Sequence, residues 1–300
     1  MMERPTIEDL EAMAAALEAS GHYRVLRKME SRVRLHAPDG SPTRLGLFVD
    51  VETTGLDPVR HEIIELAMVP FTYGLDGRIF EVGEAFHQLR QPSEPIPQEV
   101  TAITGLTDEM VAGKTIDPTE VASFAAPAAL VIAHNAAFDR KFLERFCDTF
   151  TTKPWACSMT QVPWAEEGYE GVKLAYLASG AGFFYDKHRA IQDCLAAIEL
   201  LARPLPKSGA LAFAHLLERA RRPNWRIWAE GAPFELKDVL KARGYRWNAE
   251  HGGAPRAWYI DVDEAGRDPE LAFLCREIYQ REVAPLTTRI DAHDRFSGRV

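Results

Sequence analysis

An alternating acidic segment sets the architecture of this chain: Phe48-Val49-Asp50-Val51-Glu52-Thr53-Thr54-Gly55. Apolar and acidic residues alternate and then stop at a glycine, which predicts a β-strand that runs into a turn. Successive side chains on a strand point to opposite faces. We therefore expect Asp50 and Glu52 on one face of this strand, and Val49 and Val51 on the other.

The neighbouring residues predict that this strand is buried on both faces. Leu45 and Leu47 continue the face of Val49 and Val51, while Phe48 lies on the opposite face. An unpaired charge is costly in a buried strand. Two adjacent carboxylates are kept there when a cation lies between them or when one of them is protonated. A solvated strand edge is the alternative, but the burial pattern favours a metal site.

The composition is typical of a globular protein. The chain has 300 residues, of which 46% are hydrophobic and 26% charged, enough for one large domain and a small one. The formal net charge of -9 gives no overall attraction to nucleic acid, although local basic patches and bound metal can supply it.

Several sequence features predict a cytoplasmic protein without a membrane segment. No apolar run is long enough to cross a bilayer, and the first residues carry no signal-peptide pattern. The widely spaced cysteines form no CxxC pair, so we expect neither a zinc site nor a disulfide framework. These cysteines are Cys147, Cys157, Cys194 and Cys275.

The order of predicted elements indicates a mixed α/β sheet covered by helices, followed by a small α+β domain. In the large domain we expect strands at 44–51, 62–72, 79–89, 129–133 and 155–158, a hairpin turn at 74–77, and helices near 172–181 and 189–202. In the small domain we expect helices at 210–220, 234–243 and from about 268, and strands at 224–230, 245–248 and 256–262. The predicted divisions are an N-terminal helix and strand at 1–43, the large domain at 44–203, a Pro-rich linker at 204–209 and the small domain at 210–300.

Two further motifs place acidic residues near the ends of predicted elements. Asn135 is a candidate N-cap, which puts Asp139 in the first turns of a helix, and Asp193 follows His188 at the start of another. Alone, each acid is an ordinary helix-start charge, and His188 is an ordinary capping or surface residue. Together with Asp50 and Glu52, they predict one site at the ends of the strands and helices of an α/β sheet.

Four carboxylates and a histidine suit the hydrolysis of a phosphodiester by two metal ions. Oxygen ligands favour Mg²⁺ or Mn²⁺, with two ions expected in the site. His188 is the candidate that takes the proton from the attacking water. By contrast, Gly113-Lys114-Thr115 is not a phosphate-binding loop, because Asp108 stands where that motif needs its first glycine.

The segments 49–55, 134–139 and 188–193 resemble the three motifs of the DEDDh exonuclease family, which includes the proofreading epsilon subunit of bacterial DNA polymerase III and RNase T. The resemblance covers residues 44 to 202. It implies an RNase H-like fold and the removal of nucleotides from the 3′ end of DNA or RNA.

Carried over by position, the resemblance assigns a role to each acidic residue. Asp50 and Glu52 would bind metal, with Asp50 bridging both ions. Asp193 would bind the metal on the side of the nucleophile, and Asp139 would bind the second metal, mostly through water. His188 would be the general base.

The resemblance also implies contacts to the terminal nucleotide. The backbone near Thr53 and Thr54, together with Leu56, would hold it, and Phe138 would pack on it. The loop at 103–106 would lie against the terminal base, although Thr104 stands where the family often has histidine. The complete set of expected substrate-binding residues is Thr53, Thr54, Gly55, Leu56, Thr104, Leu106, Asn135 and Phe138.

The predicted small domain is locally basic. Residues 219–260 contain nine Lys or Arg and four Asp or Glu, interleaved with aromatic residues that suit phosphate contact and base stacking. Equally, the aromatic residues could form the core of the domain. Segments 234–247 and 256–259 resemble HARP-type modules of DNA-processing enzymes. The candidates for nucleic-acid binding are Arg226, Lys237, Lys241, Arg243, Arg246, Trp247 and Trp258.

The leading hypothesis is therefore a metal-dependent 3′-5′ exonuclease that acts on DNA in repair or proofreading, with a DNA polymerase or repair complex as a candidate partner. One alternative is a 3′-5′ exoribonuclease, because no residue that reads the 2′-hydroxyl group is recognisable. The other is a non-catalytic nucleic-acid-binding adaptor, which the intact acidic set argues against.

Overall fold

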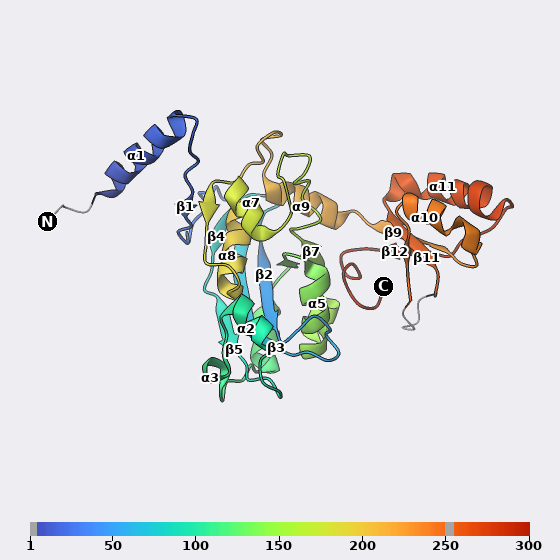
Figure 1. Ribbon diagram of the computed structural model, residues 1–300, viewed down its shortest axis with the longest axis horizontal. Coiled ribbons are helices and arrows are strands. Elements are labelled where there is room, and N and C mark those ends of the chain that lie inside the picture. Colours follow the sequence, from blue (N-terminus) through green and yellow to red (C-terminus); the bar gives the residue numbers. More distant parts are fainter. Residues whose placement is uncertain (1–4, 250–254) are drawn as a thin grey trace.

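The computed structural model describes residues 5–249 and 255–300, and its centre is a six-stranded sheet (Figure 1). The strands follow the order β4-β3-β2-β6-β7, and β5 also pairs with β3. Strands β2 and β3 are antiparallel, whereas β2, β6 and β7 are parallel, so the predicted mixed sheet is confirmed. The strands are β2 (Thr43–Thr53), β3 (Ile63–Gly74), β4 (Ile79–Val82), β5 (Phe86–Leu89), β6 (Leu130–Ala133) and β7 (Trp155–Cys157).

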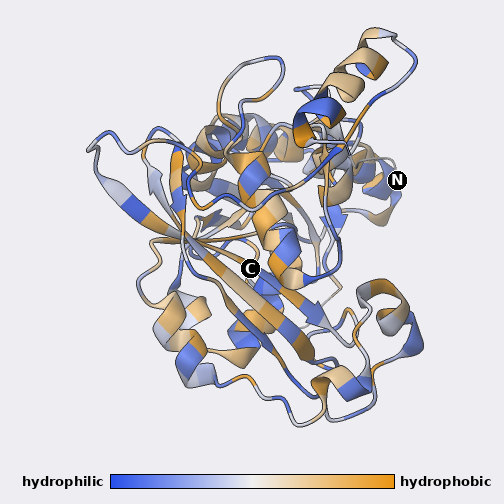
Figure 2. Ribbon diagram, turned by 90° about the vertical axis from the view of Figure 1, so that its left-hand side faces the viewer, coloured by the Kyte–Doolittle hydropathy of each residue, from blue (hydrophilic) through white to orange (hydrophobic). Residues whose placement is uncertain are grey.

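Strand β2 is buried on both faces, as its sequence predicts. Phe48 packs in one hydrophobic core with residues of α8 (Ala190–Leu201), and Val49 packs in a second core with residues of α5 (Ala136–Phe146). Figure 2 shows the long strands largely in hydrophobic colours, with helices of mixed hydropathy beside them. The remaining helices and the short strand of this domain are α2 (Gln98–Thr104), α3 (Asp108–Val111), α4 (Pro118–Ala125), α6 (Thr149–Thr152), α7 (Leu174–Gly180) and β8 (Phe183–Phe184). Within the described residues, no helix has both the length and the apolar character needed to cross a membrane.

The strand predicted at 79–89 is two strands, β4 and β5, because of a proline in the neighbouring strand. Strand β4 pairs with β3 at Phe71 and Tyr73, whereas β5 pairs with residues 65–68. Pro70 lies between these two pairings and has no N–H to donate to a ladder. The chain therefore leaves the sheet here, and Gly83 N–H donates to the Pro70 carbonyl at 2.8 Å.

The N-terminal extension has a docked part and a projecting part. Helix α1 (Ile7–Ala19) begins with a capping box between Thr6 and Asp9, and it projects from the body of the protein (Figure 1). The strand predicted within residues 1–43 is limited to β1 (Arg27–Lys28), which pairs in parallel with β8. Met29 and Leu35 pack against the core of the large domain. Residues 1–4 of this extension lie outside the described residues.

Helix α9 (Ala212–Arg221) packs on the large sheet, although its sequence position suggested the small domain. The Phe213 ring meets the rings of Phe71 and Tyr73 edge-on, at centroid distances of 5.5 and 5.1 Å. A Cβ at Gly77 would come within 2.6 Å of Ala214, so the hairpin turn also fits against α9. We therefore propose that the small domain begins after Arg222 and not at residue 210.

The expected linker at 204–209 is an ordered turn of the large domain. The backbone N–H groups of Lys207 and Ser208 donate to the buried Glu167 carboxylate at 2.9 and 3.1 Å. Leu205 is buried in the same core as α8 and α9. The segment therefore joins two helices of one domain.

The small domain is an α+β unit with an antiparallel sheet in the order β10-β11-β9-β12. Its core contains Ile227, Leu240, Tyr245 and Phe273, and Trp258 packs against it. Tyr245 and Trp258 therefore have the structural role considered above for aromatic residues of 219–260. The terminal strand β12 was not predicted. The elements of the small domain are β9 (Asn224–Ala229), η1 (Phe234–Leu236), α10 (Lys237–Ala242), β10 (Arg246–Trp247), β11 (Trp258–Val262), α11 (Glu264–Phe273), η2 (Leu274–Tyr279) and β12 (Thr287–Ile290).

The segment after β12 returns to the large domain and fastens the two domains together. The fully buried Arg140 guanidinium, on α5, donates to the carbonyls of His293 and Arg295. Trp155 N–H donates to the Ala292 carbonyl at 2.7 Å. We call residues 291–300 the C-terminal strap.

Replacing Arg140 by methionine is expected to destabilise the protein by about 3 kcal/mol, because buried carbonyls of the strap lose their donor and Glu144 loses a buried ion pair. The measurement is the midpoint of thermal unfolding. Arg145→Met, an exposed change on the same helix, is the control. Equal midpoints for the two variants would contradict the role of Arg140.

Candidate metal centre

The candidate centre lies where β2 extends past β6. The pairing of β2 with β6 covers residues 46–48, and beyond it α5 lies beside the edge of β2. Val51 N–H donates to Asp139 Oδ1 at 3.2 Å. Because α5 starts directly after β6, the local geometry brings Asp139 to the backbone between Asp50 and Glu52.

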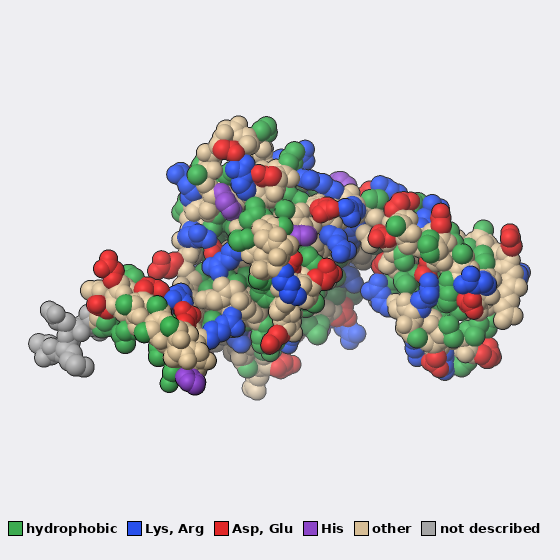
Figure 3. All heavy atoms as spheres, turned by 90° about the horizontal axis from the view of Figure 1, so that it is seen from above, with side chains coloured by type: hydrophobic (Ala, Val, Ile, Leu, Met, Phe, Trp, Pro, Cys, Tyr) green, Lys and Arg blue, Asp and Glu red, His purple; other side chains and the backbone are tan. Residues whose placement is uncertain are grey.

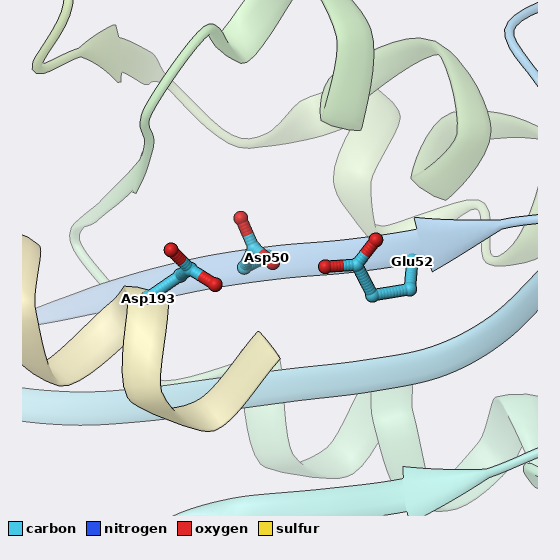
Figure 4. A group of neighbouring side chains, drawn as sticks. All are labelled: Asp50, Glu52 and Asp193. Atoms are coloured by element: carbon cyan, nitrogen blue, oxygen red, sulfur yellow. The ribbon is translucent and has the colours of Figure 1, made fainter. Parts of the chain in front are cut away.

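Three carboxylates converge from two elements. One ligand oxygen each from Asp50, Glu52 and Asp193 lies within 4.8 Å of the others. Figure 4 shows the two side chains of β2 and that of α8 pointing toward one another. The strand alternation therefore places Asp50 and Glu52 together, as predicted, and Asp193 joins them because α8 covers the same face of the sheet.

Burial and mutual repulsion make this cluster unfavourable without a counter-ion. Burial, followed by the charges of Asp139 and Asp193, raises the pKa of Asp50 well above its ordinary value. Burial, followed by the charge of Asp193, raises the pKa of Glu52 to about 8. Burial also raises the pKa of Asp139 to about 8. A set of closely spaced carboxylate oxygens fits a hard divalent cation, whose charge would favour the ionised forms.

Asp193 is oriented by groups that the sequence did not single out. The Tyr185 hydroxyl donates to Asp193 Oδ1 at 2.7 Å, and Arg189 N–H donates to Oδ2 at 3.2 Å. Burial raises the pKa of Asp193, while the Tyr185 hydrogen bond and a charged His188 act in the opposite direction. His188 therefore lies close enough to Asp193 to affect its ionisation. Its φ of 63° is uncommon for a non-glycine residue and is typical of functional loops.

A second missed residue, Glu65, links β3 to the His188 loop. It lies opposite Glu52 in the β2–β3 ladder and is fully buried. His87 Nε2 lies 2.6 Å from Glu65 Oε1, and Arg189 donates to the same oxygen at 3.1 Å. Burial raises the pKa of Glu65, but the hydrogen bonds from His87 and Arg189 outweigh it and leave this pKa lowered. A single glutamate within an otherwise apolar strand was the available signal.

An open hollow between α5 and the turn after β2 contains three of the expected nucleotide-binding residues. Leu56, Asn135 and Phe138 line it together with Lys141, and its volume is about 280 Å³. Leu56 is 83% exposed, so its side chain is free to contact a ligand.

Thr53, Thr54 and Gly55, which were also expected to bind the nucleotide, lie at the end of β2 and in the turn that follows it. Thr53 Oγ1 donates to the Gly55 carbonyl at 2.6 Å, and Thr54 N–H donates to the Glu62 carbonyl at 2.9 Å. A Cβ at Gly55 would come within 2.5 Å of the His61 ring. The Thr54 N–H and the Gly55 carbonyl are therefore used within the turn itself.

Thr104 and Leu106 are not exposed in the hollow, contrary to expectation. Thr104 Oγ1 donates to the Val100 carbonyl at 2.9 Å and accepts from Leu106 N–H at 3.1 Å. Leu106 is fully buried in a small core with Ile64 and Val111. An apolar pocket beneath the loop thus takes up the side chains that the family pattern assigned to the terminal base.

The segment 134–135 forms the turn between β6 and α5. Asn135 occupies the N-cap position but makes no side-chain cap hydrogen bond within the described chain, and its φ is 79°. Asparagine tolerates this left-handed conformation. The two ring nitrogens of His134 lie 2.9 Å from Ser158 Oγ and 2.8 Å from the Val172 carbonyl, and burial lowers its pKa to about 4.

Most basic candidates of the small domain have partners within it. Arg226 and Arg246 share Asp261, at 2.7 and 3.0 Å, and Arg243 pairs with Glu270 at 2.9 Å. Lys237 lies over the Phe234 ring at 4.1 Å. Three candidates for nucleic-acid binding remain. The rings of Trp247 and Trp258 pack together, with centroids 5.6 Å apart. Lys241 lies 3.8 Å from Asp238.

Comparisons with known proteins identify the family of this chain. The sequence profile of an exonuclease family, named for RNase T, matches residues 47–201. A DNA polymerase III of the PolC type from Caldanaerobacter subterraneus subsp. tengcongensis is 27% identical over 216 residues, which cover 66% of this chain and 15% of that protein. A DNA polymerase III subunit epsilon-like protein from Rhodobacter capsulatus is 40% identical over 185 residues, covering 58% of this chain and 26% of the relative. Both relatives thus extend far beyond the part that this chain matches.

Among solved structures, one of exonuclease I has a TM-score of 0.51 and 17% sequence identity, over 84% of this chain and 63% of that chain. At this identity the likeness shows the fold, which is RNase H-like as expected.

The raised pKa values predict how stability depends on pH without metal. Unfolded carboxyl groups lose their protons near pH 4, whereas those of Glu52 and Asp139 lose theirs near pH 8 in the folded protein. Between these values the folded state binds more protons, so stability falls as pH rises. We expect Asp139→Asn to reduce the decrease of the free energy of unfolding with pH by about 1 kcal/mol per pH unit.

The measurement is the free energy of unfolding in EDTA at pH 6, 7 and 8, followed by the same series with Mg²⁺. Mg²⁺ is expected to stabilise the protein more at pH 8 than at pH 6, because it binds the ionised carboxylates. Asp148→Asn, an exposed change, is the control. A slope that Asp139→Asn leaves unchanged would contradict this account.

Proposed function

Because this chain belongs to the RNase T exonuclease family, we propose that it is a metal-dependent exonuclease that removes nucleotides from the 3′ end of DNA. The observation that carries this proposal is the convergence of Asp50, Glu52 and Asp193 within 4.8 Å, with Asp139 held beside them. A protein that only binds nucleic acid has no need of clustered acids that repel its ligand. The names of the two polymerase relatives favour DNA over RNA and a polymerase or repair complex as partner.

The metal would be Mg²⁺ or Mn²⁺, because the converging ligand atoms are carboxylate oxygens. We propose two ions, held by Asp50, Glu52 and Asp193, with Asp139 contributing to the second. When bound, such ions supply an activated water and stabilise charge on the leaving oxygen.

The chain's own residues would orient the reaction and move the proton. His188 would accept the proton of the attacking water, in a loop that Glu65 holds through Arg189. Tyr185 would fix the Asp193 carboxylate in one rotamer. Each of these groups lies beside the cluster, so no large rearrangement is needed to assemble them.

The hollow would receive the terminal nucleotide. Phe138 offers a ring for stacking, and Leu56 offers an exposed apolar contact in the same lining. Neither contact depends on base identity, which suits an enzyme that shortens strands of any sequence.

The direct test is cleavage of 5′-labelled single-stranded DNA and of RNA with the same sequence, with Mg²⁺, with Mn²⁺ and with EDTA. We expect a ladder that shortens from the 3′ end, needs metal and is faster on DNA. Asp139→Ala is expected to lower the rate at least about a hundredfold, whereas Asp148→Ala leaves it unchanged. Binding of both polymers without cleavage would favour the adaptor function instead, and faster cleavage of RNA would favour an exoribonuclease.

Replacing His188 by alanine is expected to lower the rate by about a hundredfold or more. It should also remove the rise of rate with pH that a general base produces, which loss of a merely structural residue would not do. The measurement is the pH–rate profile of this variant beside that of His22→Ala, an exposed change in the N-terminal extension. A profile of unchanged shape would assign the base to another group.

A further inference from the structure

A basic cleft separates the large domain from the small domain. Its volume is about 490 Å³, and Figure 3 shows Lys and Arg side chains on both sides of the junction. The lining contains five cationic side chains and one acidic side chain, Asp261. The cations are Lys141 on α5, Arg219 on α9, Arg226 and Arg246 in the small domain, and Arg295 in the C-terminal strap.

Most of this positive charge is not neutralised. Asp261 is shared between Arg226 and Arg246, so the trio keeps one positive charge. Arg295 donates to the Arg222 carbonyl and to the Asn224 side chain, which are uncharged.

The two cations contributed by the large domain are the most available. Lys141 and Arg219 are exposed, and no carboxylate within the described parts of the chain forms an ion pair with either. They lie on different helices, α5 and α9, and therefore line the cleft from two directions.

The wall formed by the small domain is organised in advance. The guanidinium groups of Arg226 and Arg246 lie over the Tyr259 ring, at 4.4 and 4.9 Å from its centroid. Stacking and the shared Asp261 fix both planar groups, which lowers the entropy lost when they bind an anion. Fixed guanidinium groups suit phosphate oxygens, because two N–H groups can donate together.

The cleft adjoins the nucleotide hollow. Ala137 and Lys141, one turn apart on α5, line both the cleft and the hollow that contains Leu56 and Phe138. A strand whose terminal nucleotide occupied the hollow would therefore lead directly into the cleft.

We propose that this cleft binds the phosphate backbone of a single strand behind its 3′-terminal nucleotide, an inference that rests on the proposed nuclease function. The cleft has the volume of pockets that enclose drug-sized molecules, which suits a short stretch of one strand and not a duplex. The bound phosphates would be attracted despite the net charge of -9 and the acidic cluster nearby. The C-terminal strap, fastened by Arg140, keeps the two walls of the cleft in place.

The test uses charge reversal at Arg219, which lines the cleft but not the hollow. Binding of a 5′-fluorescent single strand is measured by anisotropy in EDTA, where no cleavage occurs, over a range of salt concentrations. We expect Arg219→Glu to weaken binding about tenfold or more and to lower the slope of log affinity against log salt by about one. Arg221→Glu, an exposed change on the same helix outside the cleft, is the matched control and should bind as the unaltered protein does.

A second substrate separates the cleft from the site of hydrolysis. A p-nitrophenyl ester of a nucleoside 5′-monophosphate can occupy the hollow without reaching the cleft. Arg219→Glu should hydrolyse this ester at the normal rate while it degrades the oligonucleotide with a raised KM. Unchanged strand affinity in this variant, equal losses on both substrates, or equal Arg219-dependent binding of a blunt duplex would each overturn the proposal. Failure of the unaltered protein to hydrolyse either substrate would refute the nuclease function. The binding experiment would still show whether the cleft binds a single strand.

Discussion

Four carboxylates are held close together in a mostly nonpolar environment, and the rest of the large domain has to oppose their repulsion. Asp50 and Glu52 cannot move apart, because β2 pairs with β3 on both sides of them and is covered by a hydrophobic core on each face. Asp139 is held by the Val51 N–H at 3.2 Å. A scaffold of this kind stores electrostatic strain that a divalent cation relieves, so rigidity and metal affinity have the same structural origin.

Glu52 and Glu65 show how environment assigns different roles to one residue type. They face each other across the β2–β3 ladder, yet burial raises the pKa of Glu52 to about 8, whereas His87 and Arg189 keep that of Glu65 low. Glu65 is thus an ionised anchor for the loop of His188, while Glu52 remains available as a ligand. Burial acts on both carboxyl groups; the neighbouring carboxylates add to it at Glu52, whereas the hydrogen bonds from His87 and Arg189 oppose it at Glu65.

Charge is also divided between regions of the molecule. The acidic groups gather beside β2, and the basic groups gather in the cleft between the domains, within a chain that is acidic overall. The C-terminal strap crosses between these regions, because Arg140 directly follows Asp139 on α5 and donates to the strap carbonyls. The helix that supplies a carboxylate to the cluster is therefore the helix that fixes the small domain.

Sequence alone determined the features that depend on local periodicity. Alternation around Asp50 predicted a buried strand with two acids on one face, and the three motifs predicted the acidic set and the fold class. Only the tertiary structure placed α9 in the large domain, split the strand at 79–89 and buried Thr104 and Leu106. It also joined Glu65 to Arg189, which lie 124 positions apart in the chain. Periodicity reveals which face of an element is apolar, but not which distant surface covers that face. That choice is made by shape and charge complementarity once the elements pack together.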